Sequence, residues 1–311
     1  MSTLSKLRAR LRSKYESWFH SFAQGSKIVY LQESLRQSQI ANDYLMSLWL
    51  QGRQPHPNPL LKHGQKFFSQ SDEDGILLEI LRRLDVSSGV SVEIGCGNGL
   101  ENNTLNLLAR GWRTVWIDAA GIAFDRNCNP RLLSYQQQFV TAENVVNLVR
   151  EGQKRLEVDR VDVLSIDVDG NDGYLASAML EAGFLPSVVV IETNEVIPPP
   201  IRFAQPYNPG HVWDRTKNYG WSLQSLADLF SRHSYVCVAC NLQTGVNAFF
   251  VRERFMDRFS DVPSNLADLY VGRSIHPLKY RDRVTQVDAN LIEAVVRAAS
   301  PTSGAADSLQ G

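Results

Sequence analysis

Short apolar runs alternate with amphipathic stretches along the middle of the chain. The run "VVVI" at 188–191 is continuously apolar, as in a buried strand, whereas "ENVVNLVREGQKRL" at 143–156 places apolar residues three or four positions apart, as in a helix. Strands are predicted at 89–95, 112–119, 134–142, 161–170 and 187–194, and helices at 69–84, 101–111, 143–156, 173–183 and 222–234. This alternation predicts an α/β fold with a doubly wound, mostly parallel sheet.

The two ends of the chain show different patterns. Residues 235–240 and 247–253 resemble two strands joined by "NLQTGV", which predicts a C-terminal antiparallel hairpin. The proline-rich "RQPHPNP" at 53–59 interrupts the helical pattern that precedes it. The expected organisation is a helical N-terminal extension and linker at 1–59, an α/β domain at 60–255, a C-terminal helical extension at 256–299 and a disordered tail at 300–311.

The first 22 residues form a basic amphipathic pattern. Apolar residues recur at helical spacing, and lysines and arginines occupy much of the remaining surface. Such a helix packs against its own domain, lies on an anionic membrane as a peripheral contact, or docks on a partner protein. The pattern leaves these three interpretations open.

Composition and charge narrow the class of protein. Hydrophobic residues make up 43% and charged residues 21%, and the formal net charge is -1, so no global field attracts nucleic acid. No apolar run approaches the roughly 20 residues of a membrane span, and no secretory signal is present, which favours a cytoplasmic protein. Cys237 and Cys240 lie in a strand pattern whose alternation sends the two thiols to opposite faces, so we expect ordinary buried cysteines.

A glycine-rich turn follows the first predicted strand and precedes a helix. In "VEIGCGNG", Gly95, Gly97 and Gly99 allow close approach of the backbone to a ligand and conformations with positive φ. A lone glycine triplet is a weak signal, but the strand–turn–helix setting is the one that a nucleotide site requires. We therefore expect a nucleoside to bind here.

Two acidic residues indicate which nucleoside. Asp118 ends the second strand, where a carboxylate can bind both ribose hydroxyls. Glu93 lies two positions before the first glycine, where it suits a cationic amino group and would repel a pyrophosphate. This arrangement, with its G-x-G-x-G spacing, favours S-adenosylmethionine over NAD.

The order of motifs resembles a known family. "FSQSDEDGIL", "VEIGCGNG", "SIDVDGND" and "NAFFVRE" follow one another as in class I methyltransferase-fold proteins related to FkbM-type methyltransferases, over about residues 67–253. The resemblance implies that 60–255 is a methyltransferase-like Rossmann domain with a seven-stranded sheet ending in an antiparallel hairpin. It also implies an S-adenosylmethionine site made by Glu93, Gly95, Gly97, Gly99 and Asp118.

The fourth predicted strand ends in "DVDGND". An EF-hand is excluded, because a loop beginning at Asp167 would have Asp172 where that loop requires glycine and Ala178 where it requires glutamate. Ligands of open α/β sheets bind beyond the carboxyl ends of the strands. Asp167 is therefore expected to contact the cofactor or the substrate, and Asp169 to act as a general base. A second interpretation is that "DGND" only caps the following helix.

A divalent cation is a further interpretation of the same strand ends. Glu192 and Asn194 end the fifth strand, beside Asp167 and Asp169. Carboxylate and amide oxygens are the ligands that Mg²⁺ prefers, so these four residues are candidate metal ligands.

The long loop at 198–221 is the candidate substrate lid. It contains Tyr207, His211, Trp213 and Tyr219 together with glycines and prolines, and aromatic rings suit a saccharide or another polyhydroxylated acceptor. His211 is the alternative catalytic base. The alternative to a substrate lid is a surface loop packed by its own aromatic residues.

Taken with the resemblance, these residues predict an S-adenosylmethionine-dependent methyltransferase that acts on a hydroxyl of a saccharide or related small molecule. The alternative from another class is a catalytically silent methyltransferase-fold module, docked on a partner or membrane by residues 1–22.

Overall fold

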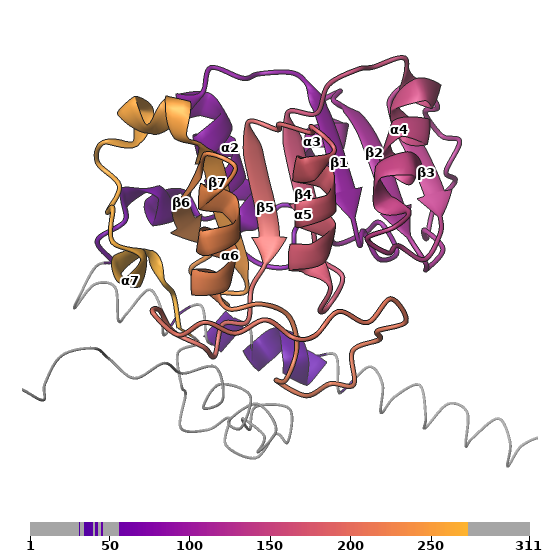
Figure 1. Ribbon diagram of the computed structural model, residues 1–311. Helices are drawn as coiled ribbons and strands as arrows, with labels where there is room; N and C mark the ends of the chain where they lie inside the picture. The colour runs from indigo at the N-terminus through magenta and orange to yellow at the C-terminus, as the bar shows by residue number, and fades with distance from the viewer. Residues whose placement is uncertain (1–30, 32–33, 40, 43–44, 46–55, 273–311) are drawn as a thin grey trace, which may run out of the picture. The chain divides into compact units, whose positions relative to one another are not determined.

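The structure is a computed structural model that describes residues 31, 34–39, 41–42, 45 and 56–272 (Figure 1). The chain divides into two units, 1–55 and 56–311. The described residues of the first unit are helical. The basic segment 1–22 and the predicted tail 300–311 lie outside the described residues, and what was expected of them stays a prediction.

A seven-stranded sheet forms the centre of the second unit, with the order β3-β2-β1-β4-β5-β7-β6. The first five strands are parallel, and β7 runs antiparallel to both β5 and β6. The strands are β1 (Val90–Ile94), β2 (Arg113–Asp118), β3 (Leu133–Gln137), β4 (Val163–Ile166), β5 (Val188–Glu192), β6 (Tyr235–Cys240) and β7 (Asn247–Arg252). The predicted fold class and its C-terminal hairpin are confirmed. The strand order reverses between β1 and β4, which is where open α/β sheets bind ligands.

Helices cover both faces of this sheet, as the alternation of patterns predicts. Figure 1 shows α4, α5 and α6 in front of the strands and α2 behind them. The helices are η1 (Pro59–His63, 3-10), α2 (Glu73–Arg83), α3 (Leu105–Ala109), α4 (Val145–Leu156), α5 (Asp172–Glu181), α6 (Leu223–Ser231), η2 (Glu253–Phe259, 3-10) and α7 (Leu266–Leu269). The helix predicted at 101–111 is shorter than expected, because the residues before Leu105 bind a buried carboxylate instead.

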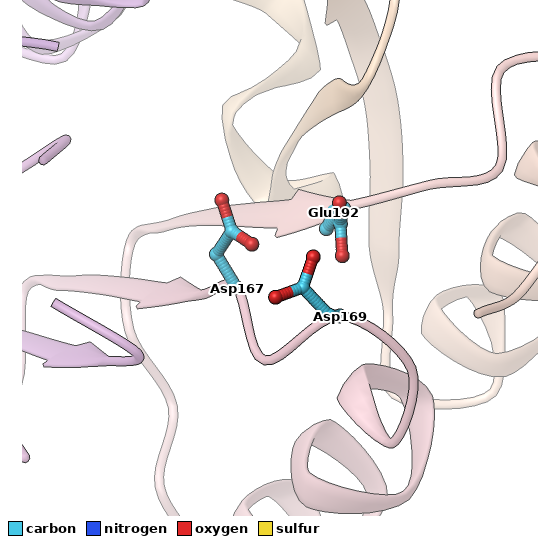
Figure 2. A group of neighbouring side chains, drawn as sticks. All are labelled: Asp167, Asp169 and Glu192. Atoms are coloured by element: carbon cyan, nitrogen blue, oxygen red, sulfur yellow. The ribbon is translucent and has the colours of Figure 1, made fainter. Parts of the chain in front are cut away.

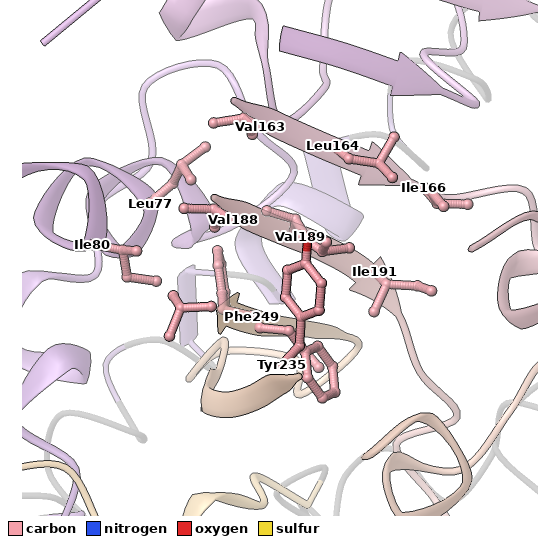
Figure 3. Packing of buried hydrophobic residues seen from close by; sticks show 14 of the residues in the cluster. Leu77, Ile80, Val163, Leu164, Ile166, Val188, Val189, Ile191, Tyr235 and Phe249 are labelled. Carbon is pink, nitrogen blue, oxygen red and sulfur yellow. The ribbon is translucent and has the colours of Figure 1, made fainter. Parts of the chain in front are cut away.

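The core lies between the sheet and its helices. Strands β4 and β5 are buried along their whole length, as expected for parallel strands covered on both faces. Leu77 and Ile80 of α2 lie beside these strands, with Phe249 of β7 in the same cluster (Figure 3). Burial of such side chains stabilises the fold by about 1.5–3 kcal/mol each, so the strand ends that carry the polar residues are held on a rigid base.

The C-terminal extension is described only as far as residue 272. It continues from β7 through η2 and α7, and Phe259 and Leu269 are buried in the same core as the sheet. The remainder of the helical extension predicted for 256–299 lies outside the described residues.

One expectation about the cysteines is wrong. A register shift between Cys237 and Ala239 interrupts the alternation of β6, so Cys237 and Cys240 do not lie on opposite faces. A hydrogen bond with Cys240, followed by burial, raises the pKa of the Cys237 thiol well above its ordinary value. Both thiols are buried, as expected for structural cysteines.

The acidic motif before α2 connects distant segments rather than forming a simple helix cap. Asp74 Oδ2 accepts hydrogen bonds from three successive backbone N–H groups, 67–69, at 2.6–2.8 Å. Asp72 accepts the N–H groups of Leu242 and Gln243 in the β6–β7 turn. The motif therefore fixes the hairpin turn against the start of α2, close to the carboxyl edge of the sheet.

Glu79 provides a test of the α2 surface. Its carboxylate accepts hydrogen bonds from Arg82 (2.7 Å) and Arg83 (2.9 Å), which lower its pKa to about 2. We expect Glu79→Gln to lower the free energy of unfolding at pH 7 by about 1–2 kcal/mol, after allowance for the solvent-exposed Arg82. Because the folded-state pKa is depressed, this loss is full above about pH 4.5 and disappears as the pH falls toward 2. Urea denaturation across that range measures it.

Glu151→Gln is the matched control for this experiment. Glu151 is exposed and lies 3.9 Å from Arg155 on α4, and such surface pairs contribute about 0.3–0.5 kcal/mol. Equal effects of the two variants would contradict the structural role assigned to Glu79.

Candidate functional site

A cavity of about 500 Å³ lies at the carboxyl ends of β1, β2, β4 and β5. Its size is within the range of small-molecule sites. The lining residues are Gln70, Glu93, Gly95, Cys96, Gly97, Glu101, Asn102, Asn103, Asp118, Asp167, Asp169, Glu192, Trp213, Lys217, Tyr219, Val246 and Asn247. Most of the predicted site residues thus meet in one cavity. Gly99, Asn194 and His211 are not among its lining residues.

The glycine turn packs directly against the chain that carries the acids. Gly95 has φ +88°, and a Cβ placed on it would lie 1.6 Å from the backbone oxygen of Asp167. At Gly97 (φ +57°) a Cβ would meet no atom within 4 Å, so this position opens into the cavity. A Cβ at Gly99 would press on Trp116 and Phe124, so Gly99 packs the turn against the protein interior rather than facing a ligand.

Glu93 has a larger structural role than the sequence indicates. Its buried carboxylate accepts hydrogen bonds from Asn102 Nδ2 (2.6 Å), the N–H groups of Asn103 (2.8 Å) and Thr104 (2.9 Å), and the Thr104 hydroxyl. Burial raises the pKa of Glu93, and these bonds oppose the rise. Three bonds reach Oε2 and one reaches Oε1. Glu93 therefore shapes the segment before α3, and Oε1 retains a free acceptor position.

Asp118 connects two turns at the rim of the cavity. Its Oδ2 accepts the N–H of Gly97 at 2.7 Å, and its Oδ1 accepts the N–H of Ala120 at 2.7 Å. Each carboxylate oxygen can accept a second hydrogen bond. The side chain thus holds the glycine turn and still offers one acceptor position on each oxygen to a ligand.

Three carboxylates come together beyond β4 and β5. Asp167 follows β4, Asp169 lies in the next turn, and Glu192 is the last residue of β5. One carboxylate oxygen from each residue lies within 4.8 Å of the corresponding oxygens of the other two. Figure 2 shows the three side chains directed toward one common region. Within residues 56–272, none of the three side chains accepts a hydrogen bond or forms an ion pair, and Glu192 Oε2 is a buried atom with no partner.

This concentration of charge affects the protonation of the group. Burial, followed by the neighbouring carboxylates, raises the pKa of Asp167 and that of Glu192 well above their ordinary values. Burial also raises the pKa of Asp169, with the nearby charge of His211 opposing and that of Asp118 adding to the rise. Each of these three carboxyl groups therefore holds its proton more strongly than a free carboxyl group does.

The "DGND" turn is closed by Asp172 and has an unusual backbone. Asp172 Oδ1 and Oδ2 accept the N–H groups of Val168 (2.9 Å) and Gly170 (2.8 Å), which precede α5, and no side-chain hydrogen bond caps this helix, so the capping interpretation is not supported. Asp169 has φ +56°, a left-handed conformation that is uncommon for residues other than glycine, although Asp and Asn tolerate it best. Figure 2 shows the Asp169 side chain directed toward Asp167 and Glu192.

The loop at 198–221 contributes one wall of the cavity through Trp213, Lys217 and Tyr219. The Trp213 and Tyr219 rings are 6.1 Å apart. His211 Nε2 lies 3.0 Å from the backbone oxygen of Asp169, so the structure places its ring against the turn and outside the cavity lining. This contact supports a role of His211 in positioning the turn.

Asn194 is also placed differently from the expectation. Its Nδ2 donates to the backbone oxygens of Lys217 and Tyr219, both at 2.8 Å, and its Oδ1 accepts the N–H of Val196. Because the chain leaves β5 after Glu192, Asn194 holds the 198–221 loop, and its amide oxygen is already engaged. The structure does not support Asn194 as a metal ligand.

Asn247 and Lys217 are among the lining residues that were not identified from the sequence. Asn247 begins β7 directly opposite Glu192, and it is 2% exposed with no partner for Oδ1. Lys217 forms a buried ion pair with Glu195 at 2.8 Å, to which the Tyr219 hydroxyl also donates. The motif "NAFFV" contains Asn247, but only the strand register places this residue beside the acids.

Comparisons with known proteins give only distant similarities. No known protein family and no curated protein matches the chain. Among solved structures, it resembles a protein named as a hemolysin from Lactococcus lactis (12% identity, 60% of this chain and 90% of that chain, TM-score 0.37). It also resembles a 1,6-didemethyltoxoflavin-N1-methyltransferase from Burkholderia thailandensis (12%, 70% and 87%, 0.33). A third is an O-methyltransferase family protein from the same organism (12%, 52% and 50%, 0.31). Similarity at this level assigns no function to the chain. No helix in the described part is long and apolar enough to cross a membrane.

Proposed function

We propose that the protein is an S-adenosylmethionine-dependent methyltransferase that methylates a hydroxyl oxygen of a saccharide or related small molecule. The observation that carries this proposal is the single cavity in which an open glycine turn, a carboxylate at the end of β2 and an acidic group meet. S-adenosylmethionine requires a turn that leaves room for it beside the protein backbone. It also requires hydrogen-bond acceptors for its ribose hydroxyls and for its ammonium group.

The residues present fit that cofactor. Gly97 leaves space in the turn, and Asp118 retains acceptor positions suited to the two ribose hydroxyls. Glu93 Oε1 has one free acceptor position, and the nearby Asn102 Oδ1 is a buried atom with no partner, so together they suit an ammonium group. Within the described lining, six acidic residues face a single lysine, which disfavours the pyrophosphate of NAD.

A bound S-adenosylmethionine would supply a methyl group on a sulfonium, whose carbon–sulfur bond would break with its electron pair left on sulfur as the acceptor oxygen bonds to the methyl carbon. The protein would supply position and a proton acceptor. The hydroxyl proton passes to Asp169, whose pKa is raised by burial. Asp167 and Glu192 lie on either side of this position and can orient the hydroxyl. Holding the reacting groups in line is the main contribution expected of the protein.

The cavity wall supports a neutral, hydroxylated acceptor. Trp213 is half-buried in the wall and offers a ring on which the apolar side of a sugar can pack, and its indole N–H is already bonded to the backbone oxygen of Thr216 at 2.8 Å. The acidic lining would repel an anionic acceptor. The proposal includes a divalent cation such as Mg²⁺, bound by the acidic group.

Isothermal titration calorimetry with S-adenosylmethionine, S-adenosylhomocysteine and NAD tests the proposal. We expect the first two to bind with one site per chain and NAD not to bind. Asp118→Ala should weaken both by at least about tenfold, because it removes hydrogen bonds to a charged acceptor worth about 1.5–3 kcal/mol each. Asp125→Ala is the matched control, since Asp125 is exposed and accepts only the N–H of Asn127. Binding of neither sulfur compound would favour the catalytically silent module.

A further inference from the structure

The acidic group contains side chains without partners. Asp167, Asp169 and Glu192 offer oxygens within 4.8 Å of one another; Glu192 is buried, Asp167 half-buried and Asp169 exposed. Within 56–272 none of these three side chains receives a hydrogen bond or forms an ion pair, whereas Asp172 in the adjacent turn accepts two backbone N–H groups. Glu192 Oε2 is buried without a partner, which is costly unless a proton or a cation compensates the carboxylate.

A second, independent atom indicates what is missing. Asn247 Oδ1 is a buried oxygen with no hydrogen-bond partner, and its residue is 2% exposed and lines the same cavity. Asn247 lies directly opposite Glu192 in the antiparallel pair of β5 and β7, and directly opposite residues project on the same face of a sheet. Its Nδ2 donates to Glu73 at 3.2 Å, which fixes the amide so that Oδ1 is the remaining atom. Asn247 Oδ1 is a hydrogen-bond acceptor, like the oxygens of the three carboxylates, so it cannot donate a hydrogen bond to them.

We infer that Asp167, Asp169, Glu192 and Asn247 form a site for a hard divalent cation. All the offered atoms are oxygens, which select Mg²⁺, Ca²⁺ or Mn²⁺ over softer metals. Two ligands of one cation lie at most twice a bond length apart, about 4.2 Å for Mg²⁺ and about 4.6–5.2 Å for Ca²⁺. The spacing of up to 4.8 Å accommodates Ca²⁺ directly and Mg²⁺ after a small side-chain rotation.

The site has a consequence for the substrate class, which rests on the proposed function. Four protein oxygens leave two positions of a six-coordinate cation for other ligands. An acceptor with two adjacent hydroxyl oxygens, such as a vicinal diol of a sugar, fills both positions. With the cation bound, Asp169 is a ligand that positions the acceptor, and the role of general base belongs to the cation-free site.

Binding of Mn²⁺, followed by electron paramagnetic resonance, tests the inference on the full chain without cofactor or acceptor. We expect one site per chain, with Mg²⁺ and Ca²⁺ as competitors. At a hundredfold excess over the dissociation constant, Mg²⁺ or Ca²⁺ should raise the melting temperature by about 5–10 °C. Glu192→Gln and Asn247→Ala should each weaken Mn²⁺ binding at least about tenfold.

The direction in which Glu192→Gln changes the melting temperature distinguishes a cation ligand from a carboxylate with a purely structural role. Glu192→Gln removes one of the three carboxyl groups at nearly constant volume. In EDTA its melting temperature should therefore equal or exceed that of the wild type, while the gain produced by added cation disappears. Glu101→Gln is the matched control, because Glu101 lines the same cavity but pairs with Lys66 at 2.7 Å on the rim. This control should bind Mn²⁺ like the wild type.

Absence of stoichiometric Mn²⁺ binding, or unchanged binding by Glu192→Gln, would overturn the inference. The same samples titrated with S-adenosylmethionine in EDTA report on the proposed function independently. Cofactor binding without Mn²⁺ binding overturns the cation site alone, and Mn²⁺ binding without cofactor binding overturns the proposed function and leaves the cation site supported.

Discussion

Asp169→Asn should reduce turnover by about 10²–10⁴-fold and leave the affinity for S-adenosylmethionine within about threefold of the wild type. The amide has nearly the same shape, and Asn tolerates the left-handed backbone at φ +56°, so the turn should keep its conformation. It cannot accept the hydroxyl proton, and general-base catalysis typically contributes this factor. Transfer of label from methyl-labelled S-adenosylmethionine to an acceptor in a metabolite extract measures turnover, and calorimetry measures cofactor affinity.

Chelation distinguishes the two roles of Asp169 in the same assay. If wild-type turnover is unchanged in EDTA, the loss in Asp169→Asn reports a missing base. If turnover disappears in EDTA and returns with Mg²⁺, the loss reports a missing cation ligand. Asp125→Asn is the control for a surface substitution of the same chemistry. A variant that retains more than about a third of wild-type turnover would contradict both roles.

The elements of the fold were predictable because they depend on local patterns. Strand β5 is apolar over 188–191 and β4 is apolar except for Ser165, and parallel strands buried on both faces favour that composition. The hairpin was predictable because "NLQTGV" separates two strand patterns. Residues at the carboxyl ends of parallel strands, including Asp118 of β2 and Asp167 after β4, are brought to the cavity by topology alone.

The errors arise where tertiary contacts override local patterns. The bulge in β6 changes which face Cys240 occupies, and no local sequence feature specifies it. The start of α3 is delayed because 102–104 bind the buried Glu93. The strand pattern places Asn194 with Glu192 at the end of the fifth strand, but the residue directly opposite Glu192 is Asn247, 55 positions later in the chain. Antiparallel register between distant segments determines that neighbour, and one sequence does not provide it.

Gly95→Ala and Gly97→Ala should have opposite profiles, although the two positions are two residues apart and both have positive φ. At Gly95 the new Cβ would lie 1.6 Å from the Asp167 backbone oxygen, so β1 and β4 must separate. We expect a loss of more than about 4 kcal/mol in the free energy of unfolding, or failure to fold. At Gly97 the Cβ meets no atom within 4 Å, so the loss is limited to backbone strain of about 1–2 kcal/mol.

Gly97→Ala should affect cofactor binding more than it affects stability. The Gly97→Ala protein folds, but its methyl group enters the cavity where the turn is expected to contact S-adenosylmethionine, so its affinity should fall at least about tenfold. Denaturation in urea and calorimetry on the same preparations measure the two quantities. If Gly97→Ala binds the cofactor as the wild type does, the glycine turn is not its binding site. If Gly95→Ala is as stable as Gly97→Ala, the turn and the carbonyl of Asp167 are not in contact. Either outcome would mean that the glycine turn and the acidic residues do not form one site, as the proposed methyl transfer requires.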